Sequence, residues 1–204
     1  ERLNVQDFVA GIPGPDLAAV DASGMDRRHL AQVGAGIVLK MVLEDGFFHA
    51  DPHPGNIFYL SGERIGVIDF GMVGRVSEQR RFQIVQLLHG LVEREAQAVT
   101  DVLMEWGEGE GEVDESRLQA DVGAFVDQYR GVPLKDLHMG LMLTDVTTIL
   151  RDNGLSLPPD LALMIKAFLT LEGFGRQLDP DFDMAGAARP YVERVLLSRY
   201  SPRA

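Results

Sequence analysis

The segment from Asp45 to Gly71 constrains this chain more than any other, because polar residues interrupt its apolar runs at irregular intervals. Its sequence is DGFFHADPHPGNIFYLSGERIGVIDFG, with two histidines, three aspartates, an asparagine and two prolines. A segment with only a scaffold role would show the regular period of a strand or a helix and would end in simple turns. The irregular pattern therefore indicates a functional site.

Periodicity predicts the elements on either side of these polar residues. Asp26 is a candidate N-cap of a helix that ends at Gly46 and carries apolar residues on one face, namely Leu30, Val33, Ile37, Val38 and Met41. Two β-rich runs, residues 57–60 and 65–69, are joined by turn-forming residues, which is typical of a hairpin. The polar residues thus lie between a helix and a hairpin.

The rest of the chain has the period of helices. Ser77 is a candidate N-cap, and helices are predicted at about 77–92, 95–106, 118–129, 135–152, 159–172 and 184–199. A glycine- and acid-rich loop is predicted at 107–115, and Asp179 and Asp181 are predicted to cap the last helix. The predicted fold class is mainly α with a small β-hairpin.

Composition excludes several classes of function. The 204 residues, 46% of them hydrophobic, suit one domain or one lobe with a packed core. A net charge of −12 opposes a surface that follows phosphate backbones, so no nucleic acid is expected as a partner. The lack of cysteine excludes disulfides and thiolate metal sites. Neither a membrane span nor a signal peptide is recognisable, and we expect the cytoplasm or the cytoplasmic face of a membrane.

A metal hydrolase is the first interpretation of the polar segment. His49, Asp51 and His53 alternate as zinc ligands on one edge of a strand would. Pro52 and Pro54 oppose regular strand pairing at this point, and the other histidines of the chain lie on helical patterns. The spacing therefore disfavours a dedicated zinc site.

A second interpretation joins the run from His49 to Asn56 with the later Asp69-Phe70-Gly71. Together they form H-x-D-x-x-x-x-N followed by D-F-G, the order found in kinase-fold enzymes. Phosphoryl transfer needs a carboxylate that orients the attacking hydroxyl group and oxygen ligands that hold Mg²⁺ against the phosphates of ATP. Because the hairpin folds the chain back, Asn56 and Asp69 can supply such oxygens together. The pattern predicts ATP and Mg²⁺ as cofactors.

These residues also resemble a particular family. DGFFHADPHPGNI followed by IDFG is similar to the UbiB (AarF) family of atypical protein-kinase-like proteins. Residues 171–183, LEGFGRQLDPDFD, resemble the C-terminal half of that family. The resemblance implies that residues 1–204 form a protein-kinase-like C-lobe that begins near the hinge, with the N-lobe absent from this chain.

By position, the resemblance implies a role for each polar residue of the segment. Asp51 is the catalytic aspartate, and His53 stands where ordinary kinases place a phosphate-facing lysine, so both are catalytic candidates. His49 is expected to support the D-F-G turn rather than to carry a proton. The metal ligands are Asn56 and Asp69, and the residues implied to bind the cofactor are Asn56, Asp69, Phe70 and Gly71.

Two parts of a complete kinase have no counterpart in this chain. Its lysines, Lys40, Lys135 and Lys166, lie on helical or loop patterns rather than on a strand, and residues 107–111 are too acidic to hold phosphates. The resemblance implies that the family's alanine-rich nucleotide loop and lysine–glutamine motif lie upstream of Glu1. We expect an ATP-dependent kinase or ATPase as the full-length protein, and an inactive isolated chain whose missing partner is the N-lobe.

The residues after Gly71 bear on the phosphoryl acceptor. They lack Ala-Pro-Glu and lead almost at once into the helix at Ser77, so little activation segment is available to position a peptide. This favours a small or lipid-like acceptor, and the resemblance implies a link to the biosynthesis of ubiquinone and related isoprenoid quinones. A few apolar residues are candidates for an acceptor groove, among them Leu137, Leu141, Met142, Ile165 and Phe168.

Two alternatives stay open. The same residues can hold nucleotide without turnover in a pseudokinase-type binding module, although the joint presence of Asp51, Asn56 and Asp69 argues against it. A small-molecule phosphotransferase of the aminoglycoside or choline kinase type carries a comparable loop. Membrane contact is possible through segments outside this chain.

Overall fold

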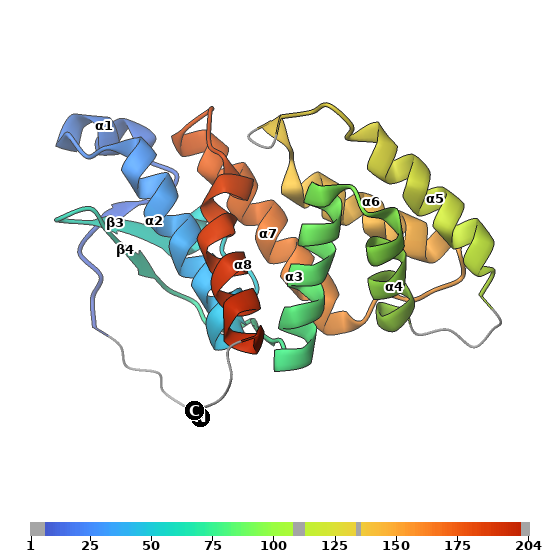
Figure 1. Cartoon of the computed structure of the whole chain (residues 1–204). Helices are drawn as coiled ribbons and strands as arrows, with labels where there is room; N and C mark the ends of the chain where they lie inside the picture. Colours follow the sequence, from blue (N-terminus) through green and yellow to red (C-terminus); the bar gives the residue numbers. More distant parts are fainter. Residues whose placement is uncertain (1–6, 108–112, 134–135, 201–204) are drawn as a thin grey trace, which may run out of the picture.

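The computed structural model describes residues 7–107, 113–133 and 136–200 (Figure 1). Most of these residues are helical, and the first half of the chain adds two small antiparallel sheets, so the predicted fold class is confirmed. The helices are α1 (Leu17–Ser23), α2 (Arg27–Lys40), α3 (Glu78–Glu93), α4 (Ala96–Trp106), α5 (Glu115–Gln128), α6 (Met139–Asp152), α7 (Pro159–Leu178) and α8 (Met184–Tyr200). The strands are β1 (Ile12–Pro13), β2 (Phe47–His49), β3 (Ile57–Leu60), β4 (Arg64–Val67) and β5 (Val73–Arg75). Within these ranges no helix is both long and apolar enough to cross a membrane.

The helix that precedes the polar segment begins and ends where its sequence predicts. The Asp26 carboxylate caps α2 by accepting hydrogen bonds from the N–H groups of Arg28 at 2.9 Å and His29 at 3.3 Å. After α2 the helical segment continues as a π-helical turn over Met41–Asp45. It ends at Gly46, whose φ of 66° is left-handed. Glycine adopts this conformation without strain, so it ends the helix and releases the chain into β2.

The predicted hairpin is confirmed and belongs to a slightly larger sheet. Strands β3 and β4 pair antiparallel, with Ile57 opposite Val67 and Leu60 opposite Arg64. Strand β1 adds to the other edge of β3. The sequence pattern misses β1 because two residues are too few to show an alternation of apolar and polar side chains.

A second sheet, which the sequence pattern also misses, closes the polar segment into a loop. Strand β2 pairs antiparallel with β5, so that Phe47 lies opposite Arg75 and His49 lies opposite Val73. The pairing brings the residues after the D-F-G run next to β2. Strand β2 leads into the loop from Ala50 to Asn56, which we call the catalytic-loop candidate. Both ends of the candidate site are therefore attached to one two-stranded ladder.

The helices pack on one another in a closed order around a single core (Figure 1). In this order α2 contacts α7, α7 contacts α6, α6 contacts α5, α5 contacts α4, α4 contacts α3, α3 contacts α8, and α8 contacts α2. Helix α7 also contacts β5. The core is contiguous, and its large, fully buried side chains include Trp106, Phe168, Leu39, Leu103 and Leu143. Burial of this size accounts for most of the stability of such a fold.

Three predicted details at the C-terminal helices are wrong. Helix α6 begins at Met139, later than the predicted start, part of which lies outside the described residues. Helix α7 continues past Glu172 to Leu178, and its second glycine, Gly175, packs against Phe182 rather than ending the helix. The first turn of α8 is capped by Asp183, which accepts a hydrogen bond from the Gly186 N–H at 2.7 Å. Asp179 instead forms an ion pair with Arg28 at 3.2 Å.

Two glycines of α7 make a matched pair for testing this packing. A Cβ on Gly175 would collide with the ring of Phe182, which is 3% exposed, whereas a Cβ on Gly173 would meet no atom of the neighbouring parts of the chain. We expect Gly175→Ala to destabilise the full-length protein by about 1–3 kcal/mol, the usual cost of overpacking. Gly173→Ala should stabilise it by roughly 0.5–1 kcal/mol through helix propensity. Thermal unfolding measures both, and equal melting temperatures would contradict the packing.

Candidate functional site

The loop between β2 and β3 is shaped by hydrogen bonds within itself. The His53 N–H donates to the Asp51 carbonyl oxygen at 2.8 Å, and the Asn56 N–H donates to the His53 carbonyl oxygen at 2.9 Å. The Nδ1 of His53 accepts from the Gly55 N–H at 2.9 Å and so caps the 3₁₀ turn Pro54–Asn56. One ring nitrogen of this exposed histidine therefore holds the shape of its own loop.

His49 joins the loop to the D-F-G segment. It is 3% exposed, its Nδ1 accepts from the Asp51 N–H at 3.0 Å, and its Nε2 lies 3.1 Å from the Ile68 carbonyl oxygen. Since a carbonyl oxygen can only accept, Nε2 carries the proton and the ring is the neutral tautomer. Its ring centroid lies 5.0 Å from that of Phe70. Both nitrogens are thus bound to backbone groups, which agrees with the expected supporting role.

Asn56 directly precedes the β3–β4 hairpin, and Asp69 follows it. The Asn56 carbonyl oxygen accepts from the Ile68 N–H at 2.9 Å, and its side-chain Nδ2 donates to the Asp51 carbonyl oxygen at 3.1 Å. The amide nitrogen of this buried asparagine is therefore used by the loop, whereas Oδ1 remains a ligand candidate. Asp69 has a φ of 57°, unusual for a residue with a side chain, and its Oδ1 accepts from the Gly71 N–H at 3.3 Å.

The sequence pattern gives no sign of one further residue at the site. Lys166 lies on α7, far from the loop along the chain, and its Nζ forms an ion pair with Asp51 Oδ1 at 2.9 Å. On sequence alone it is a lysine on the solvated face of a helix, so no local signal points to Asp51. Its place follows from the packing of α7 against α2 and from the contact of α7 with β5.

The ion pair favours the charged form of the candidate catalytic carboxylate. The hydrogen bond from Lys166 lowers the pKa of Asp51 below its usual range, against a smaller opposing effect of desolvation. A positive charge on His53 would act in the same direction. Asp51 is therefore ionised at neutral pH, as a group that accepts a hydrogen bond from an attacking hydroxyl must be.

The oxygen donors of the site suit Mg²⁺ better than zinc. Asn56 Oδ1 and the Asp69 carboxylate are hard oxygen ligands, and Mg²⁺ in nucleotide sites uses one or two protein oxygens together with phosphates and water. The described residues contain no cluster of three or more histidine, cysteine or acidic side chains. His49 has both nitrogens engaged and His53 has one engaged, so the alternating histidines are not arranged as a zinc site.

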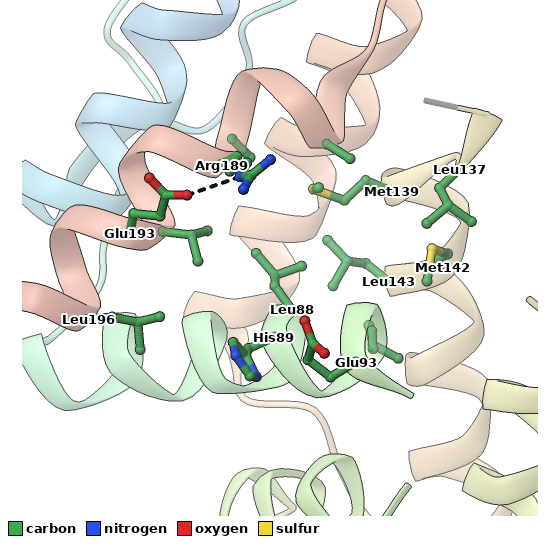
Figure 2. A pocket seen from close by; sticks show the side chains of 14 residues that line it. Leu88, His89, Glu93, Leu137, Met139, Met142, Leu143, Arg189, Glu193 and Leu196 are labelled. Atoms are coloured by element: carbon green, nitrogen blue, oxygen red, sulfur yellow. Dashed lines mark hydrogen bonds and ion pairs between the residues drawn. The ribbon is translucent and has the colours of Figure 1, made fainter. Parts of the chain in front are cut away.

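An apolar cavity of about 450 Å³ lies between α3, α6 and α8. Figure 2 shows the side chains of Leu88, Leu143 and Leu196 from these helices around it, with the Arg189–Glu193 ion pair at its edge. Of the apolar residues that the sequence suggests for an acceptor groove, Leu137 and Met142 line this cavity, Ile165 and Phe168 are buried, and Leu141 is exposed. None of its lining residues belongs to the catalytic-loop candidate or to the D-F-G segment.

Comparison with known families decides the relationship of this chain. Residues 1–103 match the ABC1 atypical kinase-like domain, which is just over half of the sequence. This chain belongs to the ABC1 atypical kinase-like family. Residues 122–183 match the UbiB helical domain. The predicted relationship to UbiB is thereby confirmed, and so is the protein-kinase-like class of the fold.

Curated relatives carry the UbiB name. "Probable protein kinase UbiB" of Xylella fastidiosa (strain M23) is 34% identical over 209 residues, which cover 100% of this chain and 38% of that protein. The proteins of the same name from Xanthomonas axonopodis pv. citri (strain 306) and Xanthomonas campestris pv. campestris (strain B100) have the same identity and coverage. The chain thus spans 38% of the length of these relatives.

The two family matches divide the candidate site unequally. Asp51, His53, Asn56 and the D-F-G segment lie within the residues that match the ABC1 atypical kinase-like domain. Lys166 lies within the residues that match the UbiB helical domain. The ion pair between Lys166 and Asp51 therefore connects the two matched parts of the chain.

Proposed function

We propose that residues 1–204 are the C-lobe of an ATP-dependent kinase or ATPase of the UbiB type. In this proposal Asp51 orients the attacking oxygen, and Asn56 and Asp69 hold Mg²⁺ against the phosphates of ATP. The observation that carries it is the network of backbone hydrogen bonds that connects the three residues, which we call the frame of the site. His49 bonds to the backbone on both sides of the site, and Asn56 bonds to Ile68, the residue that precedes Asp69.

The frame makes each residue suited to its proposed task. Asn56 uses its amide nitrogen internally and keeps an oxygen for the metal, and Asp69 is an exposed carboxylate whose backbone conformation is set by the turn. Bound Mg²⁺ would neutralise charge on the phosphates. Phe70 and Gly71 complete the proposed nucleotide site. His53 is a second catalytic candidate, since its Nδ1 alone is used to cap the loop.

Turnover is favoured over a nucleotide-holding pseudokinase by the state of Asp51. A binding module needs metal ligands but no oriented, ionised carboxylate in the catalytic-loop position. Here the carboxylate is paired with Lys166 at 2.9 Å, and its pKa is lowered by that contact. The side chain is also 34% exposed, so an acceptor can reach it. This combination supports transfer of a phosphoryl group to a hydroxyl group or to water.

The acceptor proposed for the full-length protein is small or lipid-like, linked to isoprenoid quinone biosynthesis. Between Gly71 and the start of α3 at Glu78, the chain forms only the short strand β5, which pairs with β2. No long segment remains there to present a peptide, although the relatives are named as protein kinases. We place this activity in the cytoplasm or at the cytoplasmic face of a membrane.

An acceptor assay tests this function. The full-length protein is incubated with MgATP and either a panel of generic protein substrates or membranes that contain isoprenoid quinone precursors. We expect ATP turnover to respond to the membranes and to depend on Asp51, because Asp51→Asn removes the carboxylate that orients the acceptor, at a cost of about 10²-fold or more. Asp51-dependent phosphorylation of proteins, with no response to lipid or quinone-like compounds, would overturn the proposed acceptor.

A further inference from the structure

Lys166 joins Asp51 from a part of the chain outside the match to the kinase-like domain. Its Nζ lies 2.9 Å from Asp51 Oδ1, and the two side chains are 48% and 34% exposed. An ion pair with this exposure contributes only about 0–1 kcal/mol to stability, so stability does not explain why α7 presents a lysine to the catalytic-loop candidate.

The ammonium group has capacity for a second contact. It carries three N–H donors, and Asp51 Oδ1 accepts from one of them. Lys40 differs in this respect, since it binds both carboxylate oxygens of its near neighbour Asp45, at 2.6 and 2.8 Å. Lys40 forms a local surface ion pair. Lys166 links two distant segments and has N–H donors left for a ligand beside Asp51.

Among the described residues, the arginines that follow the site in the sequence have contacts of their own. The loop from Asp51 to Asn56 contains no lysine or arginine. Beyond the D-F-G segment, the guanidinium of Arg75 lies 5.4 Å from the ring centroid of Phe47. Arg81 binds the carbonyl oxygen of Glu44. A third arginine of this region, Arg80, donates to Gln83 at 3.2 Å. The charge that develops on a transferring phosphoryl group is best stabilised by fixed cations, and among the described residues Lys166 holds its ammonium group against Asp51.

We propose that Lys166 is a catalytic residue of the phosphoryl-transfer site. It orients the Asp51 carboxylate and donates hydrogen bonds from its remaining N–H groups to the phosphoryl group during transfer. The inference rests on the function proposed above. The acceptor oxygen forms a bond to the γ-phosphorus, the bond from that phosphorus to the β,γ-bridging oxygen breaks, and ADP leaves with the electron pair. The acceptor proton passes to Asp51. Lys166 remains an ammonium ion throughout.

The test uses basal MgATP hydrolysis by the full-length protein, with water as the acceptor. We expect Lys166→Met to lower kcat by about 10²-fold or more with little change in KM for ATP, because the contact forms with the transferring group. Lys166→Arg should recover part of the activity, since it keeps the charge but not the geometry. Lys40→Met, the matched control, should retain full activity.

A double variant separates this role from a structural one. If Lys166 and Asp51 act as a unit, Lys166→Met combined with Asp51→Asn should be no slower than Asp51→Asn alone. Melting temperatures of all variants should lie within a few degrees of the wild type, as expected for a half-exposed pair. A decrease in melting temperature that accounts for the activity loss, with no recovery by Lys166→Arg, would overturn the inference.

The inference and the proposed function fail in different ways. If Asp69→Asn abolishes turnover but Lys166→Met leaves it unchanged, the inference is wrong and the proposed function stands. Faster turnover by Lys166→Met would mean that the ion pair restrains Asp51, which also overturns the inference. If neither substitution changes turnover, the proposed function itself is wrong.

Discussion

Asp69→Asn in the full-length protein is expected to abolish Mg²⁺-dependent nucleotide binding or to reduce turnover by about 10³-fold or more. Asparagine has nearly the same shape and can still accept the hydrogen bond that the Gly71 N–H now donates to Asp69 Oδ1 at 3.3 Å. The turn should therefore survive, while the negative charge on the metal ligand is lost. MgATP titration and steady-state turnover measure the two effects.

A matched aspartate controls for the loss of charge alone. Asp101 on α4 is exposed and accepts a local hydrogen bond from Gln97 at 2.8 Å, so Asp101→Asn removes a comparable carboxylate away from the hairpin. This variant should bind and turn over MgATP like the wild type. Unchanged activity of Asp69→Asn would remove Asp69 from the metal site, and equal losses in both variants would indicate a nonspecific effect of charge.

The isolated 204-residue chain is expected to bind MgATP poorly and to turn over at least about 10³-fold more slowly than the full-length protein. Its described residues supply candidates for one side of the nucleotide site. The sequence predicts neither the phosphate-covering loop nor the strand lysine of a complete kinase in this chain. Without them, the phosphates lose a preorganised set of donors, and binding must order the nucleotide against one lobe only.

Calorimetry with MgATP checks this expectation on the isolated chain, with helical circular dichroism as the test that the chain is folded. The full-length protein under the same conditions is the positive control. Micromolar affinity of the folded chain would show that these residues form a sufficient nucleotide site, and it would contradict the prediction that an N-lobe is needed.

Local signals in the sequence determined much of the fold. Asp26 and Ser77 cap α2 and α3 as predicted, because a cap depends only on a side chain and the next few N–H groups. Gly46 ends the first of these helical segments through a left-handed turn, and the β3–β4 hairpin follows from two short apolar runs around a turn. Each of these features depends only on residues that are close together in the sequence.

The sequence also predicts which residues form the candidate site. The order of Asp51, Asn56 and Asp69 around a hairpin predicts which residues come together, and His49 was expected to support the D-F-G turn. Its contacts with Asp51 and Ile68 agree with that expectation. The catalytic and metal-binding roles themselves stay predictions for the experiments above.

Only the tertiary structure decided which distant residues complete these features. Glu172 resembles part of a family motif in sequence, but in the fold it is a buried carboxylate that accepts from the Gly140 N–H at 2.7 Å and so ties α7 to α6. Strand β2 pairs with β5, and the packing of α7 against α2 and β5 brings Lys166 to Asp51. The residues around a side chain do not predict its partner when the partner is determined by how whole helices pack. Such a contact depends on the summed burial of many residues rather than on local propensity.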